Sequence, residues 1–263
     1  MADTIEITLA QADDAETLAD ISKRSFDSDT EVGALGPGGP PGYDSVEVHE
    51  KDTHSEHLDY WKVLYNGRIV GGTRAYKVSS EHIYIYGVFV DPDFHRMGIG
   101  AKFFSLIENN YPHAKKWTLD TPVWNVRTKG FYEKIGFVQV GVLRWVPDFE
   151  LRYFVKINDA SYLDEDTSIS KLSDGMKGLR VEGVVENISE VREVTSSKDG
   201  EKKRVANMTL RDDTGSITLV LWNDMIRQVC EGERVIIERG YAKDYNGQLQ
   251  LSISNGQIII LQH

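Results

Sequence analysis

The chain has 263 residues, of which 40% are hydrophobic and 27% charged, and its formal net charge is −11 at pH 7. This length exceeds the usual size of one hydrophobic core, so we expect more than one domain. No apolar run approaches the ~20 residues of a membrane span, and the N-terminus lacks a basic stretch followed by an apolar one. We therefore expect a soluble, cytoplasmic protein with no membrane partner.

Cysteine and histidine usage argues against disulfides and metal sites. The single cysteine, Cys230, excludes an internal disulfide, and we expect it to be a small buried apolar residue rather than a reactive thiol. His49, His54 and His57 share one segment, but no cysteine or ordered carboxylate set accompanies them. We expect no metal.

The first part of the chain predicts alternating strands and helices. The pattern favours a strand at Ile5–Leu9, a helix at Asp13–Phe26 and a short helix near Tyr43, with later strands near 60–65, 68–78 and 82–90. Gly33–Gly42, GALGPGGPPG, joins the two helices and cannot be regular structure. This loop either covers a substrate or is a stiff connector.

A glycine turn follows the strand that ends at Val90. The strand sequence IYIYGVFV is β-branched and aromatic, and Asp91-Pro92 stops it. Ile99, Phe103 and Ile107 then recur at helical spacing, so the turn opens a helix. Glycines at 98 and 100 admit a ligand close to the backbone, and the first turn's unpaired N–H groups favour a phosphate. Taken alone, such a turn also fits mere tight packing.

A second block strengthens the ligand interpretation. A strand at 117–121 precedes a short helix in which Asn125 lies seven residues before Tyr132, and FYEKIGF ends that helix at Gly136. Two closing strands are expected at 137–145 and 150–157.

Over residues 3 to 157 the two blocks together resemble the GNAT acetyltransferase family, with its mixed α/β sheet. The resemblance implies acetyl-CoA as acyl donor, and its glycine pattern places His95 where glutamine or arginine is usual. By the same resemblance Asn125 and Tyr132 flank the pantetheine arm, and the strand before the turn splays from its neighbour. The pyrophosphate would meet His95, Arg96, Met97, Gly98, Ile99, Gly100 and Ala101, and main-chain atoms of Val88, Phe89 and Val90 would bond the arm.

The implied chemistry is acyl transfer from a thioester to an amine of a small molecule or a protein. Tyr132 would give a proton to the departing thiolate, since a tyrosine with a pKa near ~10 keeps its proton until needed. The alternative is a helix tyrosine that covers the core edge. No base is assigned, because Glu81, His82, Tyr84, Tyr86 and Asp120 all fit ordinary surface or core positions. Asp27, Asp29 and Glu31 either attract a cationic amine or form a solvated charge run.

A composition change marks the domain boundary. Asn158–Ser168, NDASYLDEDTS, is polar and acidic and lacks periodicity, so we expect domains at 1–157 and 169–263 joined by a linker at 158–168. After it, five segments alternate apolar with polar residues, the first of them a single long strand at 179–194. They are separated by turns at 198–200, 213–215 and 246–247, with a short helical insert at 224–229. This pattern favours a five-stranded OB-fold barrel.

The barrel sequence resembles archaeal single-stranded DNA-binding proteins and replication protein A over most of residues 173 to 254. The resemblance implies that Trp222, Tyr241 and Tyr245 stack with bases, and that phosphates meet Arg192, Lys198, Lys202, Lys203 and Arg204. From Lys171 onward, however, the sequence contains 13 Lys and Arg residues and 14 Asp and Glu residues, so this domain is close to neutral. Binding of nucleic acid should therefore be modest and salt-sensitive. Alternatively Trp222 belongs to the core and the lysines are solvated, or the barrel holds a protein partner or forms a homodimer.

The sequence therefore predicts an acetyl-CoA-dependent N-acetyltransferase that carries a module for single-stranded nucleic acid. Two other functions stay open. The first domain could sense acyl-CoA without turnover, or the barrel could serve protein–protein contacts.

Overall fold

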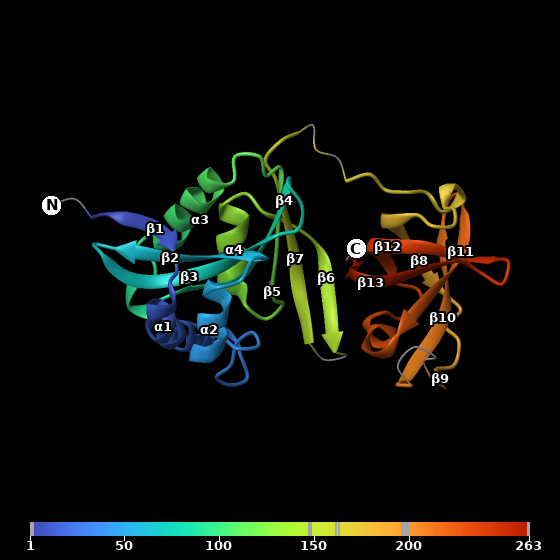
Figure 1. The fold of residues 1–263 in the computed structure, drawn as a ribbon, viewed down its shortest axis with the longest axis horizontal. Helices are drawn as coiled ribbons and strands as arrows, with labels where there is room; N and C mark the ends of the chain where they lie inside the picture. The colour runs from blue at the N-terminus through green and yellow to red at the C-terminus, as the bar shows by residue number, and fades with distance from the viewer. Residues whose placement is uncertain (1–2, 147–148, 161, 163, 196–199, 262–263) are drawn as a thin grey trace. The chain divides into compact units, whose positions relative to one another are not determined.

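The computed structural model describes residues 3–146, 149–160, 162, 164–195 and 200–261. The chain forms two compact units, each visible in Figure 1. The first comprises Met1–Val138 and Phe154–Tyr162, and the second comprises Gln139–Tyr153 and Leu163–His263.

The first unit is built on a mixed sheet. Its strands lie in the order β1 (Ile5–Leu9), β2 (Leu58–Tyr65), β3 (Arg68–Lys77), β4 (His82–Val90) and β5 (Lys116–Pro122). The pairs from β1 to β4 are antiparallel, and β4 with β5 is parallel. Next in the order come β7 (Phe149–Ile157) and β6 (Val138–Val146), two strands whose residues are divided between the units.

Helices cover both faces of this sheet. Figure 1 shows α1 (Ala15–Asp27) and α2 (Val46–Thr53) below β2 and β3, and α3 (Ile99–Asn110) above them. Apolar side chains of β2 alternate between two cores, because successive strand residues point to opposite faces. Leu58 and Tyr60 pack with Leu18 and Ile21 of α1, whereas Trp61 and Val63 pack with α3 and with α4 (Val126–Lys134).

A β-bulge in β4 changes which face its side chains occupy. The β3–β4 register runs from Gly72–Phe89 to Arg74–Tyr86, so Gly87 and Val88 together oppose one residue of β3. Gly87 has a φ of 65°, a left-handed conformation that glycine adopts readily. Before the bulge Ile83 and Ile85 face the α3 core, whereas after it Phe89 faces the α1 core. Tyr84 and Tyr86 alternate with Ile83 and Ile85 and so point to the face that carries α1 and α2, and the bulge brings Phe89 to that same face.

The second unit contains a closed circuit of five strands. They are β8 (Lys177–Glu186), β10 (Lys202–Asp212), β11 (Gly215–Trp222), β13 (Gln248–Ile260) and β12 (Arg234–Tyr245), and β12 pairs back to β8. Inward-facing residues such as Val181, Leu210 and Leu219 are fully buried. The segment predicted as one long first strand is divided in the structure, because β9 (Arg192–Thr195) folds back onto the start of β10.

Some of the turns predicted for the second unit are found in the structure. Asn246 and Gly247 have positive φ values of 54° and 82°, which suits a two-residue hairpin turn. The predicted helical insert is the 3-10 helix η5 (Asn223–Gln228). The turn predicted at 198–200 falls largely outside the described residues.

The structure also bears on the predicted burial of Cys230 and on membrane-spanning helices. Cys230 is exposed, so the prediction that it is a buried apolar residue is wrong. Within the described ranges, no helix combines the length and the apolar character needed to cross a membrane.

Candidate functional site

Strands β4 and β5 separate partway along their length. Their parallel register runs from His82–Lys116 to Ile85–Leu119, and no further pair joins them among the described residues although both strands continue. Phe89 is 1% exposed, with its ring in the core, whereas Val88 and Val90 are half-buried. The edge of β4 that lies toward β5 is therefore unpaired beyond Ile85 among the described residues, and the binding of a ligand by main-chain atoms of 88–90 stays a prediction.

The glycine turn lies between the 3-10 helix η3 (Pro92–Phe94) and α3. Arg96 and Gly98 have positive φ values of 63° and 78°, and Gly98 is the N-cap of α3. A side chain at Gly98 would meet nothing within 4 Å, so this side of the turn is open. The main-chain N–H groups at the start of α3 have no acceptor within the helix, and such curled backbone favours anions.

The other predicted residues of the turn have different surroundings. Ile99 is buried, Met97 and Ala101 are exposed, and a Cβ at Gly100 would lie 3.2 Å from the ring of Phe131. Gly100 therefore also serves the close packing of α3 against α4.

His95, the departure from the family's pattern, directs its ring to the strand. Its Nε2 lies 2.8 Å from the carbonyl oxygen of Val90, and since a carbonyl only accepts, Nε2 donates. Nε2 of His95 and the carbonyl oxygen of Val90 are thus both occupied by this hydrogen bond. The main-chain N–H of His95 is also used, since it donates to the carbonyl oxygen of Pro92 at 3.1 Å.

Asn125 and Tyr132 lie at opposite ends of α4. Asn125 is 1% exposed, and its Oδ1 caps the helix by accepting from the Thr128 amide at 3.1 Å. Tyr132 is 6% exposed and packs against Phe104 and Phe154. Burial raises the pKa of Tyr132, and the nearby charges of Asp120 and Asp29 act in the same direction. Tyr132 therefore stays protonated and can donate.

The sequence did not reveal the role of Asp29. Asp29 is buried, forms an ion pair with Arg127 and hydrogen-bonds Asn125, so it ties the chain after α1 to the start of α4. Burial raises the pKa of its carboxyl group. Asp27 is likewise paired, with Lys23 and with the Tyr43 hydroxyl. Asp27 and Asp29 are thus paired residues rather than a free, cation-attracting run.

The connector 33–42 reaches the bulge. Pro40 lies 3.9 Å from the position that a Cβ of Gly87 would occupy. The only sequence signal for this contact is the isolated Gly87 within a strand pattern, which is typical of a bulge or a close approach.

In the second unit, the strand register brings the three predicted stacking residues to one face. Ser252 pairs with Tyr241 on β12 and with Val220 on β11, and Trp222 lies two residues beyond Val220. Paired residues, and residues two apart on a strand, share a face. Tyr245, four residues after Tyr241, joins them and is 63% exposed.

The predicted phosphate-binding cations of this unit are largely paired. Nζ of Lys202 lies 2.8 Å from Glu193, Nζ of Lys203 lies 3.9 Å from Glu201, and the Arg204 guanidinium lies 3.0 Å from Asp224. Arg192 is exposed, and Lys198 lies outside the described residues. The carboxylates reduce the positive potential that these cations offer to phosphates.

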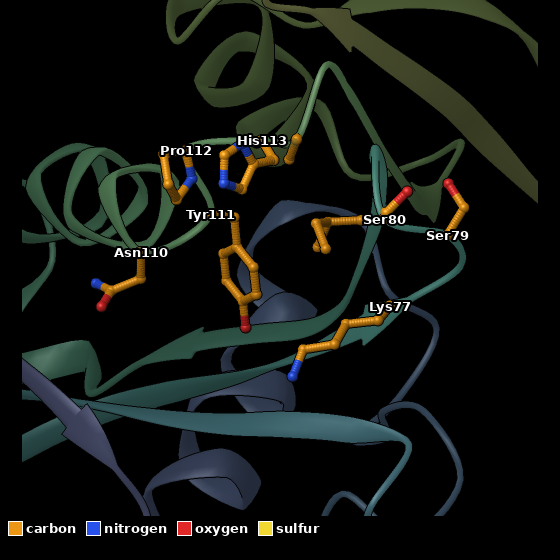
Figure 2. Close-up of a pocket in the computed structure, with 9 residues that line it drawn as sticks. Lys77, Ser79, Ser80, Asn110, Tyr111, Pro112 and His113 are labelled. Carbon is orange, nitrogen blue, oxygen red and sulfur yellow. The ribbon is translucent and has the colours of Figure 1, made fainter.

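A pocket of about 210 Å³ lies on the face of the first unit that carries α3 (Figure 2). Its walls include Lys77, Ser79, Tyr111 and His113. None of the predicted site residues lines this pocket. Among the described residues, no group of His, Cys, Asp or Glu could hold a metal ion.

Comparisons with known proteins match each part separately. Residues 23–137 match the acetyltransferase (GNAT) family, and residues 179–261 match the OB-fold nucleic acid binding domain. YrkN of Bacillus subtilis, an uncharacterised protein, is 32% identical over 80 residues, which are 29% of this chain and 43% of YrkN. The match thus spans less than half the length of that relative.

Two solved structures illustrate the likeness. The PaiA N-acetyltransferase of Thermoplasma acidophilum in complex with coenzyme A is 14% identical, with a TM-score of 0.48 over 59% of this chain and 99% of that chain. The second OB-fold domain of replication protein A from Methanococcus maripaludis is 30% identical, with a TM-score of 0.32 over 36% of this chain and 95% of that chain. The predicted fold classes are confirmed: a GNAT-like α/β domain, in which residues 23–137 match the acetyltransferase (GNAT) family, is followed by a β-rich domain that matches the OB-fold.

Proposed function

We propose that the GNAT domain transfers the acetyl group of acetyl-CoA to an amine and that the OB-fold domain binds single-stranded nucleic acid. The proposal of acetyl transfer rests on the opening between β4 and β5, together with the open glycine turn that follows β4. A protonated tyrosine, Tyr132, belongs to the same domain. The same proposal includes a first domain at 1–157, a linker at 158–168, an OB-fold domain at 169–263, and a cytoplasmic location.

Acetyl-CoA fits the residues present. The open turn at Gly98, with its free main-chain N–H groups, suits a diphosphate, and the unpaired edge of β4 suits the amides of the pantetheine arm. The bound coenzyme supplies the activated acetyl thioester. Main-chain N–H groups of 88–90 stabilise the oxyanion, an interaction worth about 3 to 4 kcal/mol when well aimed. Tyr132 gives a proton to the departing sulfur.

Ala101→Glu tests the diphosphate site. Ala101 is exposed in the first turn of α3, where a carboxylate stabilises the helix dipole but repels a diphosphate. We expect unchanged or higher thermal stability together with an acetyl-CoA affinity at least about tenfold lower by calorimetry. Ser105→Glu, one turn further along the same helix, is the matched control and should bind normally. Equal binding by both variants would contradict the proposed turn.

Release of the CoA thiol separates catalysis from sensing. We expect the full-length protein to release CoA with at least one class of amine in a panel of polyamines, aminoglycosides, peptide N-termini and lysine peptides. Binding of acetyl-CoA without release across the panel would support the sensor alternative.

The nucleic-acid half rests on the face shared by Trp222, Tyr241 and Tyr245. Aromatic stacking contributes about 1 to 3 kcal/mol per base and tolerates any sequence. A short oligothymidine should quench tryptophan emission in the wild type but much less in Trp222→Phe. Sedimentation of the free protein tests the alternative, a barrel that forms a homodimer or holds a protein partner.

The two halves together would concentrate the acetyltransferase near targets bound to single strands. Acetylation of such a target should then slow in Tyr241→Ala, while acetylation of a free amine stays unchanged. Equal rates on both substrates would exclude this tethering.

A further inference from the structure

Three tyrosine rings gather on the face of the sheet that α1 and α2 cover. Tyr76 of β3 and Tyr84 and Tyr86 of β4 have ring centroids 6.1 to 6.2 Å apart in all three pairs. All three residues are half-buried, so none of them is fully covered by the rest of the protein. They form an aromatic wall beside the bulge at Gly87, on the face opposite the pocket of Figure 2.

Asp120 lies next to this wall, at the point where the strands separate. It is the first residue of β5 after Leu119, the last one paired with β4. Its Oδ2 accepts a hydrogen bond of 2.6 Å from the hydroxyl of Tyr84, and among the described residues this hydroxyl is the only partner of its side chain. Asp120 is half-buried, and burial raises the pKa of its carboxyl group. A carboxylate with no counter-ion among the described residues thus lies beside the tyrosines at the residue where the pairing of β4 and β5 ends.

Charge around the wall also favours a cation. The nearest guanidinium, that of Arg74, is buried, lies 2.6 Å from Asp52 and stacks over the Tyr60 ring at 4.8 Å. The charges of Arg74, Asp52 and Asp120 all act on Tyr86, so two carboxylates stand against one guanidinium. Tyrosine faces attract ammonium groups through their π-electrons, and a desolvated carboxylate gains from pairing with one.

We propose that Tyr76, Tyr84, Tyr86 and Asp120 form the acceptor pocket, which takes a primary amine as its ammonium ion, with Asp120 as the proton acceptor. This inference rests on the proposed acetyl transfer. Tyr132 responds to the charge of Asp120, so the proton acceptor and the proton donor lie in the same region.

Two protons leave the amine during the reaction. Asp120 takes the first from the ammonium and passes it to solvent, which frees the nitrogen lone pair to form the C–N bond. When the C–S bond breaks, Tyr132 protonates the sulfur, and the second proton of the nitrogen replaces the one that Tyr132 gave. The products are an N-substituted acetamide and the CoA thiol.

Asp120→Asn is the decisive variant, because the amide still accepts from Tyr84 but takes no proton. With the best amine of the panel, we expect kcat for CoA release to fall about 10² to 10⁴-fold with unchanged acetyl-CoA affinity. Asp59→Asn is the matched control, since Asp59 accepts from the hydroxyl of Tyr111 at 2.5 Å near the pocket of Figure 2. It should retain the wild-type rate. An Asp120→Asn rate within threefold of wild type would overturn the inference.

A binding readout needs no turnover. In saturation-transfer NMR on the coenzyme-free protein, n-butylamine should give a signal at least about tenfold stronger with wild type than with Asp120→Asn, whereas n-butanol should not distinguish them. Equal butylamine signals from wild type and Asp120→Asn would overturn the proposed acceptor pocket but would not contradict the proposed acetyl transfer. A wild type that binds acetyl-CoA but releases no CoA with any amine would overturn the proposed function, and this inference with it.

Discussion

His49 and Tyr60 form a buried hydrogen bond of 2.6 Å, in which the Tyr60 hydroxyl donates to Nδ1 of the imidazole. The other ring nitrogen, Nε2, donates to the carbonyl oxygen of Tyr43 at 3.0 Å. His49 is 0% exposed, and its ring packs on Phe89. The imidazole thus fixes the end of the glycine- and proline-rich connector against the sheet, and it can do so only while neutral.

This arrangement predicts loss of stability in mild acid. Burial lowers the pKa of His49 from 6.5 to about 4. Because the unfolded chain takes up the proton first, the contribution of His49 is complete above pH 6.5 and is lost as the pH falls toward 4. The loss amounts to roughly 3 kcal/mol. The charges that act on the ring are those of Arg74, Asp52 and Asp44, and the main-chain carbonyl of Tyr43 accepts from it.

Urea unfolding at several pH values tests this prediction. His49→Gln should be less stable by about 1 to 3 kcal/mol at pH 7, yet its stability should vary less with pH between 6.5 and 4. Carboxylates titrate in both proteins, so the difference between the two curves isolates the histidine. Parallel curves would refute the assigned pKa.

Gly87 and Gly130 should respond oppositely to alanine. Gly87 has a φ of 65°, so Gly87→Ala introduces backbone strain and should destabilise by about 1 to 2 kcal/mol. Gly130 lies exposed within α4, and nothing lies within 4 Å of the Cβ that an alanine would add, so Gly130→Ala should stabilise by about 0.5 to 1 kcal/mol. Thermal denaturation measures both changes. Shifts of the same sign would contradict the bulge.

Tyr132→Phe should separate catalysis from binding. The variant keeps the ring packing against Phe104 and Phe154 but lacks the proton donor, so we expect kcat to fall about 10² to 10⁴-fold while acetyl-CoA affinity changes little. Steady-state CoA release and calorimetry provide the two values. A parallel loss of affinity would instead make Tyr132 a binding residue.

Tyr241→Ala should weaken oligothymidine binding by about 1 to 3 kcal/mol, as expected for one lost stacking platform. The salt dependence should be shallow, because Lys202, Lys203 and Arg204 already face carboxylates. Fluorescence anisotropy at several salt concentrations measures both quantities. A steep salt dependence with no effect of Tyr241→Ala would point to phosphate contacts in place of stacking.

Local sequence signals predicted most of the elements. The strands at 5–9 and 82–90 have the predicted limits, and α1 begins only two residues after the predicted start. The prediction failed where pairing overrides a continuous pattern, as at the division between β8 and β9. It also failed for Cys230, since composition alone does not tell whether a small residue faces the core.

By itself the sequence determined the two fold classes, the glycine turn, and Asn125 and Tyr132 as members of one helix, because these depend on spacing along the chain. Only the tertiary structure decided that Asp29 holds Asn125, that a bulge at Gly87 brings Phe89 to the same face as Tyr84 and Tyr86, and that Asp120 lies where the strands separate. Residues distant in sequence meet only through strand register and helix packing. A bulge of one residue reverses every side-chain direction that follows it, and local periodicity does not contain that information.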